Sequence, residues 1–243
     1  MDTLNLSGKA AIVTGGGTGI GRAIAINLAG QGMKVAVAGR RTEPLEETVA
    51  AIASTAGTAM AVPANVTERG DVDQLVAEVA KRSGNPYLLV NNAGIGGSAP
   101  IHRHDADVWE KVLAVNLTGP FLMARYCLPL MRQQGEGHIV NISSESGLEY
   151  HEGNGAYGVS KHALNALAEF IQRENQDLGI RVDTVCPGMV VTPMSKGSPG
   201  LNEEQCLYPE DIADLVGWLV SRRPNVKIGR PILIQTMVNP WGG

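Results

Sequence analysis

The sequence predicts an α/β protein built on a doubly wound parallel sheet, and three observations support this. Short, β-branched apolar runs alternate with amphipathic stretches along all 243 residues. Each run is almost continuously apolar, as expected of strands that helices cover on both faces. The 30 glycines gather at turns between these runs. Together these features indicate a Rossmann-type sheet of about seven strands with helices on both faces.

The apolar runs locate the expected strands in order. They are Ala10–Val13, Val35–Ala38, Ala59–Pro63, Leu88–Val90, His138–Ile142, Arg181–Val185 and Ile232–Gln235. Between them, apolar residues recur at helical spacing, for example at Ile20, Ala23, Ile24 and Leu28. No internal repeat, low-complexity tract or linker divides the chain, so we expect one domain over residues 1–243. Only Val190–Tyr208 reads as a long irregular loop, and at such a length a substrate loop or lid is expected at about 190–208.

Composition excludes several classes of protein. The net charge is −4, and basic residues form no run longer than the pairs at 40–41 and 222–223, which argues against nucleic acid or an anionic membrane as a partner. Cys127, Cys186 and Cys206 are odd in number and lack metal-ligand spacing, so we expect free thiols and no metal site.

The first nine residues lack the basic-then-apolar profile of a signal peptide, and no apolar run reaches about 18 residues. We therefore expect a cytoplasmic protein.

A glycine-rich turn follows the first strand. The segment Thr14-Gly15-Gly16-Gly17-Thr18-Gly19-Ile20-Gly21 leads directly into a helix. Glycines let a backbone approach a pyrophosphate, and a helix N-terminus offers unpaired N–H groups and a positive dipole end. The alternative is a tight turn without a ligand, but the strand before it and the helix after it favour a nucleotide. The expected cofactor contacts here are Gly15, Gly17, Thr18, Gly19, Ile20 and Gly21.

Tyr157 and Lys161 are four residues apart in a helical pattern, so they share one helix face. A free tyrosine has a pKa of about 10 and is a poor base near neutrality. An adjacent ammonium is expected to favour the phenolate and lower that pKa, which would suit general acid–base catalysis.

These motifs are spaced as in a known family. The glycine turn reads T-G-x-x-x-G-x-G, Asn91-Asn92-Ala93-Gly94 follows the fourth strand, and Ser144 precedes Tyr157-x-x-x-Lys161 by 13 residues. Asn116, Pro187-Gly188 and Thr192 complete the set. The chain resembles the short-chain dehydrogenase/reductase family, in its short single-domain branch, over nearly its whole length.

The resemblance implies roles for these residues. Tyr157 would exchange a proton with the carbonyl or alcohol oxygen, and Ser144, rather than the rival Ser143, would hold that oxygen. Lys161 would also bind the nicotinamide ribose, as would Tyr157 from its side of the cofactor. Asn116 would anchor a water in a proton relay. The nicotinamide carboxamide would be fixed by Pro187, Gly188, Val190 and Thr192.

The end of the second strand bears on the choice of cofactor. An acidic residue there usually binds the adenosine 2′-OH of NAD, but this chain has Gly39-Arg40-Arg41. Guanidinium groups suit a 2′-phosphate, so Arg40 and Arg41 favour NADP(H) over NAD(H). Pairing with Glu43 and Glu46, or simple solvation, is the alternative. The resemblance further places Asn65 and Val66 at the adenine, and Asn92, Ala93 and Gly94 beside the adenosine ribose.

The C-terminal part departs from many relatives, which end in a strand followed by Asp-Gly-Gly, since here the run from Ile232 to Met237 is followed by Val238-Asn239-Pro240-Trp241. Short segments at 208–213 and 223–226 are similar to NADP-dependent 3-hydroxy acid and serine dehydrogenases. The turn at 132–136 carries one arginine and one glutamate, which makes an acidic carrier protein a weaker fit.

We therefore expect an NADP(H)-dependent oxidoreductase, a ketoreductase acting on a small carbonyl or alcohol. Alternatives are a 3-oxoacyl carrier-protein reductase and a non-catalytic NADP(H)-sensing protein on the same fold. The resemblance implies a homotetramer. The polar segment Glu145–Asn154 favours small polar substrates over long acyl chains, although Met189 and Met194 could line an apolar slot. In the expected helix from Val108 to Met131, Pro120 has no N–H for the carbonyl of Asn116, so a kink and a water site are expected there.

Overall fold

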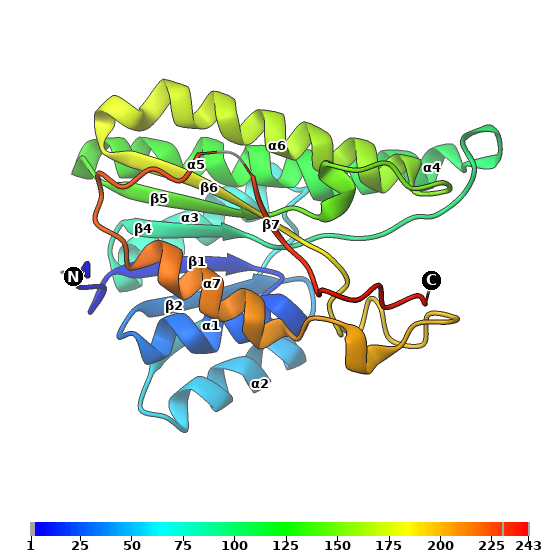
Figure 1. Ribbon diagram of the computed structural model, residues 1–243. Coiled ribbons are helices and arrows are strands. Elements are labelled where there is room, and N and C mark those ends of the chain that lie inside the picture. The colour runs from blue at the N-terminus through cyan, green and yellow to red at the C-terminus, as the bar shows by residue number, and fades with distance from the viewer. Residues whose placement is uncertain (1–2, 230, 243) are drawn as a thin grey trace.

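The computed structural model describes residues 3–229 and 231–242. Its centre is a parallel seven-stranded sheet in the order β3-β2-β1-β4-β5-β6-β7 (Figure 1). The strands are β1 (Ala10–Thr14), β2 (Lys34–Gly39), β3 (Thr58–Pro63), β4 (Pro86–Asn91), β5 (Gly137–Ile142), β6 (Ile180–Pro187) and β7 (Ile232–Ile234). Every neighbouring pair is parallel. The doubly wound sheet and its strands are thus confirmed, each within about three residues of its expected bounds.

The chain reverses its direction of travel across the sheet between β1 and β4. Sheets with this order bind ligands in the crevice outside the carboxyl ends of the strands at the reversal. The segments that follow β1, β4, β5 and β6 all emerge at that edge, the right-hand side of Figure 1. The fold therefore gathers the expected site residues from distant parts of the chain.

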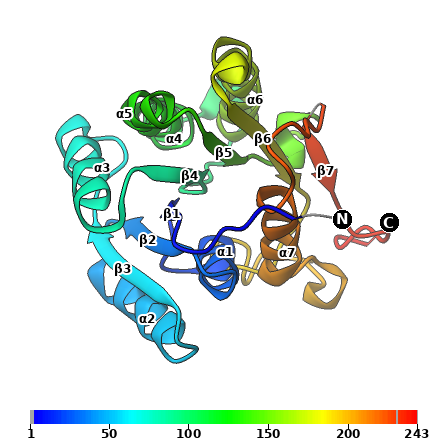
Figure 2. The ribbon, with the colours of Figure 1, turned by 90° about the vertical axis from the view of Figure 1, so that its left-hand side faces the viewer.

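Seven α-helices and five shorter helical segments connect the strands among the described residues. The α-helices are α1 (Gly19–Gly30), α2 (Thr42–Ala53), α3 (Arg69–Ser83), α4 (Ala106–Leu113), α5 (Gly119–Gln134), α6 (Gly155–Asn175) and α7 (Pro209–Val220). The shorter segments are η1 (Ile101–Arg103), η2 (Ala114–Thr118), η3 (Glu145–Gly147), η4 (Gln176–Leu178) and η5 (Glu203–Gln205). Helices α1, α2 and α7 cover one face of the sheet, and α3, α5 and α6 cover the other (Figure 2).

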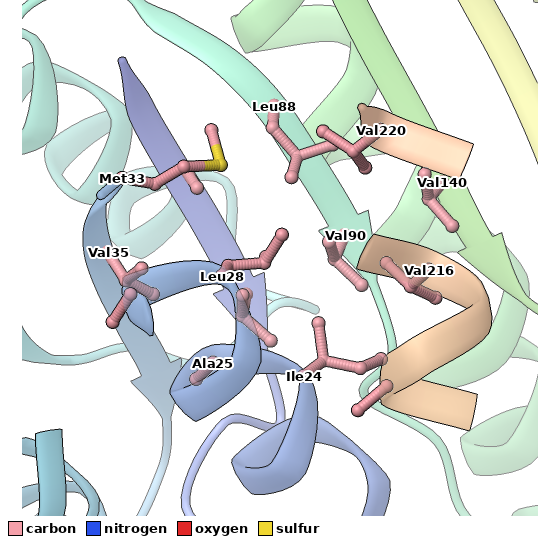
Figure 3. Packing of buried hydrophobic residues seen from close by; sticks show 14 of the residues in the cluster. Ile24, Ala25, Leu28, Met33, Val35, Leu88, Val90, Val140, Val216 and Val220 are labelled. Carbon is pink, nitrogen blue, oxygen red and sulfur yellow. The ribbon is translucent and has the colours of Figure 1, made fainter. Parts of the chain in front are cut away.

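The core has two parts because successive residues of a strand point to opposite faces. In β1, Ala11 and Val13 belong to the cluster under α1 and α7, whereas Ala10 and Ile12 belong to the cluster under α3, α5 and α6. Figure 3 shows the first cluster, where Leu28 of α1 lies among side chains of α7 and the sheet. The fully apolar strands expected from the sequence are explained by this two-sided burial.

The expected long helix from Val108 to Met131 is interrupted. A π-helical segment, η2, joins α4 to α5, and the N–H of Gly119 bonds to the carbonyl of Ala114, five residues back. Pro120 lies in the first turn of α5, where a missing N–H costs little. A π-helical turn thus stands where we expected a kink in a continuous helix, while the kink itself, a free Asn116 carbonyl and its water stay predictions.

The segment from Val190 to Tyr208 is irregular, as expected, apart from η5. Its two ends are tied together, because Val191 N–H donates to Leu207 O at 2.9 Å and Leu207 N–H donates to Met189 O at 2.9 Å. The C-terminal segment is hydrogen-bonded to the middle of this loop, where Asn202 N–H donates to Pro240 O at 2.9 Å. In Figure 1 both segments lie beyond the carboxyl ends of the strands.

None of the described helices combines the length and hydropathy needed to cross a membrane. Cys127, Cys186 and Cys206 are free and buried, which confirms the expectation of free thiols. In the described part of the chain, no three His, Cys, Asp or Glu side chains come together as a metal site would require.

Candidate active site

The glycine turn after β1 is shaped for a ligand that approaches the backbone. Gly15 has φ +64° and Gly19 has φ +52°, a region that L residues with side chains rarely adopt. A Cβ atom on Gly21 would lie 2.3 Å from the carbonyl oxygen of Gly15, so only glycine fits there. A Cβ on Gly17 would similarly meet Pro44 at 2.9 Å. The sequence needs its glycines at these positions for the turn to form.

Helix α1 starts at this turn without the usual capping groups. Its N-cap residue, Thr18, makes no side-chain cap hydrogen bond, and the first turn contains no acidic residue. The N-terminal N–H groups of α1 are thus left for a ligand, and the dipole favours an anion. This site fits the diphosphate of a dinucleotide.

Two side chains lock this turn to the loop after β4. The Thr14 hydroxyl accepts from the N–H groups of Asn92 and Ala93 at 3.0 and 3.1 Å. The Asn92 side chain donates to the carbonyls of Thr14 and Gly15 at 2.9 and 3.3 Å. Asn92 and Gly94 line the same cavity as Gly15, so the two expected contact segments do meet. Thr14 is a positioning residue that sequence reasoning did not single out.

The cavity at this turn has a volume of about 210 Å³. Its wall combines Thr18, Gly19 and Ile20 with Tyr157 and Lys161, and with Thr192 from the loop after β6. Thr192 faces the turn closely, because a Cβ on Gly19 would lie 3.2 Å from its Cγ2. The Ser195 hydroxyl holds Thr192 by accepting from its N–H at 3.0 Å.

The expected adenosine contacts after β2 and β3 do not line this cavity. Arg40 and Arg41 are exposed just after β2, and the ion pairs found in the described chain involve neither of them, so the expected alternative of pairing with Glu43 or Glu46 is not seen. The Asn65 side chain accepts from Thr67 N–H at 3.2 Å and closes the turn after β3.

Val66 and the loop after β6 serve as packing and anchoring points. Val66 is buried against Gly119, where a Cβ would lie 2.9 Å from its side chain. Gly188 N–H donates to Ile234 O at 2.8 Å, which ties the loop after Pro187 to β7. The Val190 carbonyl accepts from the Ser195 hydroxyl at 2.7 Å.

A second cavity, of about 400 Å³, lies over the catalytic candidates. Ser144 and Tyr157 both line it, and the Ser144 hydroxyl is near enough to the Tyr157 phenol to influence its pKa. The Ser144 hydroxyl also accepts from Ser146 N–H at 3.1 Å, which starts η3 and fixes the side chain. Ser143 lines the cavity as well, but its hydroxyl donates to the Lys161 carbonyl at 3.3 Å, which leaves Ser144 as the hydroxyl beside the phenol.

Lys161 and Asn116 lie behind Tyr157. Lys161 is buried, and its ammonium donates to the carbonyl of Ile142 at 2.8 Å. Asn116 is fully buried, and its side chain both accepts from and donates to the backbone of Ile95, at 2.9 and 3.0 Å. Its amide also donates to the Ser160 hydroxyl at 3.0 Å. Asn116 thus fixes the segment after Gly94 to the helix that carries Tyr157.

The pKa of Tyr157 corrects one expectation. Burial raises it above 10.0, and only the Ser144 hydrogen bond opposes that, whereas the charge of Glu145 raises it further. Lys161, which we expected to lower it, is not among the groups that shift it, although its ammonium lies 5.5 Å from the centre of the ring. Burial in turn lowers the pKa of Lys161 to about 8.

Several lining residues of the second cavity were not expected as site residues, and three of them bear on the substrate. Met194 and Trp241 come from the loop after β6 and from the C-terminal segment, and Glu145 follows Ser144 directly. Glu145 and Met194 had a partial signal in the sequence, because they belong to the polar segment and to the apolar slot described above. Trp241 had no such signal, since its place depends on how the last segment folds back.

The fold and this site define a dinucleotide-binding α/β protein with a serine–tyrosine–lysine group at the carboxyl edge of its sheet. The profile of the family described as short chain dehydrogenase matches residues 9–200. The chain belongs to the short-chain dehydrogenase/reductase family, and it is an oxidoreductase of that family.

Similar proteins support this assignment over the whole chain. An uncharacterized oxidoreductase of Staphylococcus epidermidis is 34% identical over 221 residues, which are 90% of this chain and 94% of that protein. A metagenomic short-chain oxidoreductase, solved in complex with NADP, has a TM-score of 0.85 and 31% identity, with 97% of this chain and 100% of that one covered. Levodione reductase has a TM-score of 0.88 and 29% identity, with 95% and 97% covered.

Proposed function

We propose that this protein is an NADP(H)-dependent reductase or dehydrogenase that acts on a carbonyl/alcohol pair, with Tyr157 as general acid and base. One observation carries the proposal: Ser144 and Tyr157 line a cavity that adjoins the uncapped N-terminus of α1. A proton carrier and a nucleotide cradle that share one space are the two requirements of hydride transfer to a carbonyl.

The residues divide the work as follows. The bound nicotinamide cofactor supplies or accepts the hydride. Ser144 donates a hydrogen bond to the substrate oxygen and holds it beside Tyr157. Tyr157 gives its phenolic proton to that oxygen during reduction and takes it back during oxidation. A raised pKa suits the first task, because a protonated phenol is the form that donates.

Lys161 and Asn116 support Tyr157. Lys161 binds the nicotinamide ribose and holds its ammonium over the Tyr157 ring. Asn116 anchors the water that carries the proton onward, through its backbone carbonyl near the π-helical turn before Pro120. Pro187, Gly188, Val190 and Thr192 hold the nicotinamide, and the loop at 190–208 closes over the substrate.

The preference for NADP(H) rests on Arg40 and Arg41. Both guanidinium groups are exposed at the end of β2, and the position before them is glycine rather than a carboxylate. A 2′-phosphate offers the acceptor oxygens that two guanidiniums bind well. The NADP in a solved relative of the same fold supports the proposal. Asn65 and Val66 would hold the adenine, and Asn92, Ala93 and Gly94 would flank the ribose.

An acyl carrier protein is a poor partner by comparison. Arg132, the basic residue of the turn at 132–136, already donates to the side chain of Asn175 at 2.8 Å and to the carbonyl of Glu174 at 3.3 Å. It is therefore engaged within the chain. We retain a cytoplasmic homotetramer as the expected form of the enzyme.

Oxidation of NADPH and of NADH by the purified protein tests the proposal, with aldehydes, ketones and 3-oxo acids as substrates. We expect NADPH to be consumed with at least one carbonyl compound. Binding of NADPH without turnover of any carbonyl would contradict the enzyme and favour the cofactor-sensing alternative.

A further inference from the structure

The second cavity, of about 400 Å³ over Ser144 and Tyr157, contains one charged side chain among its described lining residues. Its described lining residues include hydroxyl, amide, thioether and indole groups, but the only ionised group among them is the carboxylate of Glu145. Neither lysine nor arginine occurs in that described lining. A substrate in this cavity therefore meets the negative charge of Glu145, while the positive charge of Lys161 lies in the wall of the adjoining cavity, over the Tyr157 ring.

Glu145 is held toward this space by its surroundings. It begins η3, directly after Ser144, and its Oε2 atom accepts from the side-chain amide of Gln235 at 2.7 Å. A Cβ on Gly188 would lie 3.0 Å from the same oxygen, so the glycine leaves room for the carboxylate. The ion pairs found in the described chain do not include Glu145, which is half-buried. Its charge also reaches Tyr157, whose pKa it raises.

A third cavity, of about 630 Å³, continues the same wall outward. It shares Glu145 and Trp241 with the second cavity, and its lining also includes Glu149 and Glu152. Its described lining also contains no lysine or arginine. The route to Tyr157 thus has negative potential along one side, which concentrates cations and repels anions.

A half-buried carboxylate without a cationic partner is stabilised by a ligand that brings one. The indole of Trp241 adds a face that attracts cations, and an ammonium group fits between such a face and a carboxylate. A carboxylate or phosphate ligand would instead be placed against Glu145, at a cost.

We propose that the carbonyl substrate carries an ammonium group, that is, it is an amino ketone or amino aldehyde, and that Glu145 and Trp241 select it. This inference rests on the proposed function and names its substrate class. Glu145 binds the ammonium, Trp241 covers it, and the carbonyl carbon then lies at Ser144 and Tyr157. The bound cation also offsets the effect of Glu145 on Tyr157.

Two matched pairs of ketones test this with the whole enzyme and NADPH. Acetonyltrimethylammonium and methyl neopentyl ketone have the same shape and differ in one charge, and aminoacetone and hydroxyacetone form a smaller pair. We expect kcat/KM to be about ten- to hundredfold higher for the cation of at least one pair, the range for a hydrogen bond or contact to a charged group. In Glu145→Gln this ratio should fall toward one, and in Glu174→Gln, an equal loss of charge on the far end of α6, it should not change.

A neutral ketone reduced as well as its cation in both pairs overturns the inference, as does a ratio that survives in Glu145→Gln. Reduction of other ketones but of none of these four also overturns it, and leaves the proposed function standing. Failure on every carbonyl compound would contradict the proposed function itself and this inference with it.

Discussion

The Nζ atom of Lys161 lies 5.5 Å from the centre of the Tyr157 ring and donates a hydrogen bond to the carbonyl of Ile142 at 2.8 Å. The ammonium is therefore placed between an aromatic face and the end of β5, away from water. The same burial that lowers the pKa of Lys161 raises that of Tyr157. Burial thus separates the two pKa values, so that Lys161 loses its proton at a lower pH than Tyr157.

Replacement of Lys161 by methionine should change how stability depends on pH. An unfolded lysine titrates near 10.5 and Lys161 near 8. Below pH 8 both states are charged and burial of the charge costs about 3 kcal/mol. Between pH 8 and 10.5 only the unfolded state keeps the proton, so the stability of the wild type should rise with pH relative to Lys161→Met.

Chemical unfolding of the cofactor-free protein from pH 7 to 11 measures this difference. Lys81→Met, on the exposed surface of α3, should run parallel to the wild type. A constant difference between wild type and Lys161→Met across the range would show that the ammonium is not buried as described.

Two glycines of α1 should respond in opposite ways to alanine. In Gly21→Ala the new Cβ would lie 2.3 Å from the Gly15 carbonyl oxygen, which should cost about 1–3 kcal/mol of stability and weaken cofactor binding. In Gly30→Ala nothing lies within 4 Å, and the variant should gain about 0.5 kcal/mol from lower chain entropy in the unfolded state. Denaturant unfolding and NADPH titration of both variants distinguish close packing from simple helix propensity. Equal changes in stability and in NADPH binding for the two variants would argue against a glycine turn shaped for the cofactor.

The exposed arginines after β2 should decide between the two nicotinamide cofactors. Removal of both in Arg40→Ala/Arg41→Ala should raise the Kd for NADPH by about ten- to hundredfold and change that for NADH by less than about twofold. Titration of each cofactor by fluorescence or calorimetry gives both constants, and Arg82→Ala, an exposed arginine near the end of α3, is the control. Wild-type protein that binds both cofactors equally would refute the preference.

Most of the fold could be predicted because burial on two faces leaves a strong pattern. Strands such as Ala10–Thr14 carry apolar residues on both faces, and glycine or asparagine marks the turns after β1, β4 and β6. The interruption at Asn116 could be placed from Pro120, but not its π-helical form, because several local geometries relieve one missing N–H.

The site was predictable where a residue's position follows from sequence spacing, and less so where it depends on tertiary contacts. Tyr157 and Lys161 share a helix face by spacing alone, but the burial that raises the pKa of Tyr157 depends on tertiary packing, so the lowered pKa that we expected was wrong. Trp241 enters the cavity only because Pro240 is bonded to Asn202, 38 residues earlier in the chain.

The most direct test of the account is the turnover of Tyr157→Phe. This change removes the phenolic oxygen and keeps the ring under Lys161. With a ketone that the wild type reduces, we predict that kcat falls by about a hundred- to ten-thousandfold while the Kd for NADPH changes little. Tyr126→Phe on α5, outside both cavities, should keep wild-type turnover. A Tyr157→Phe enzyme that reduces the ketone at a near-normal rate would contradict the account.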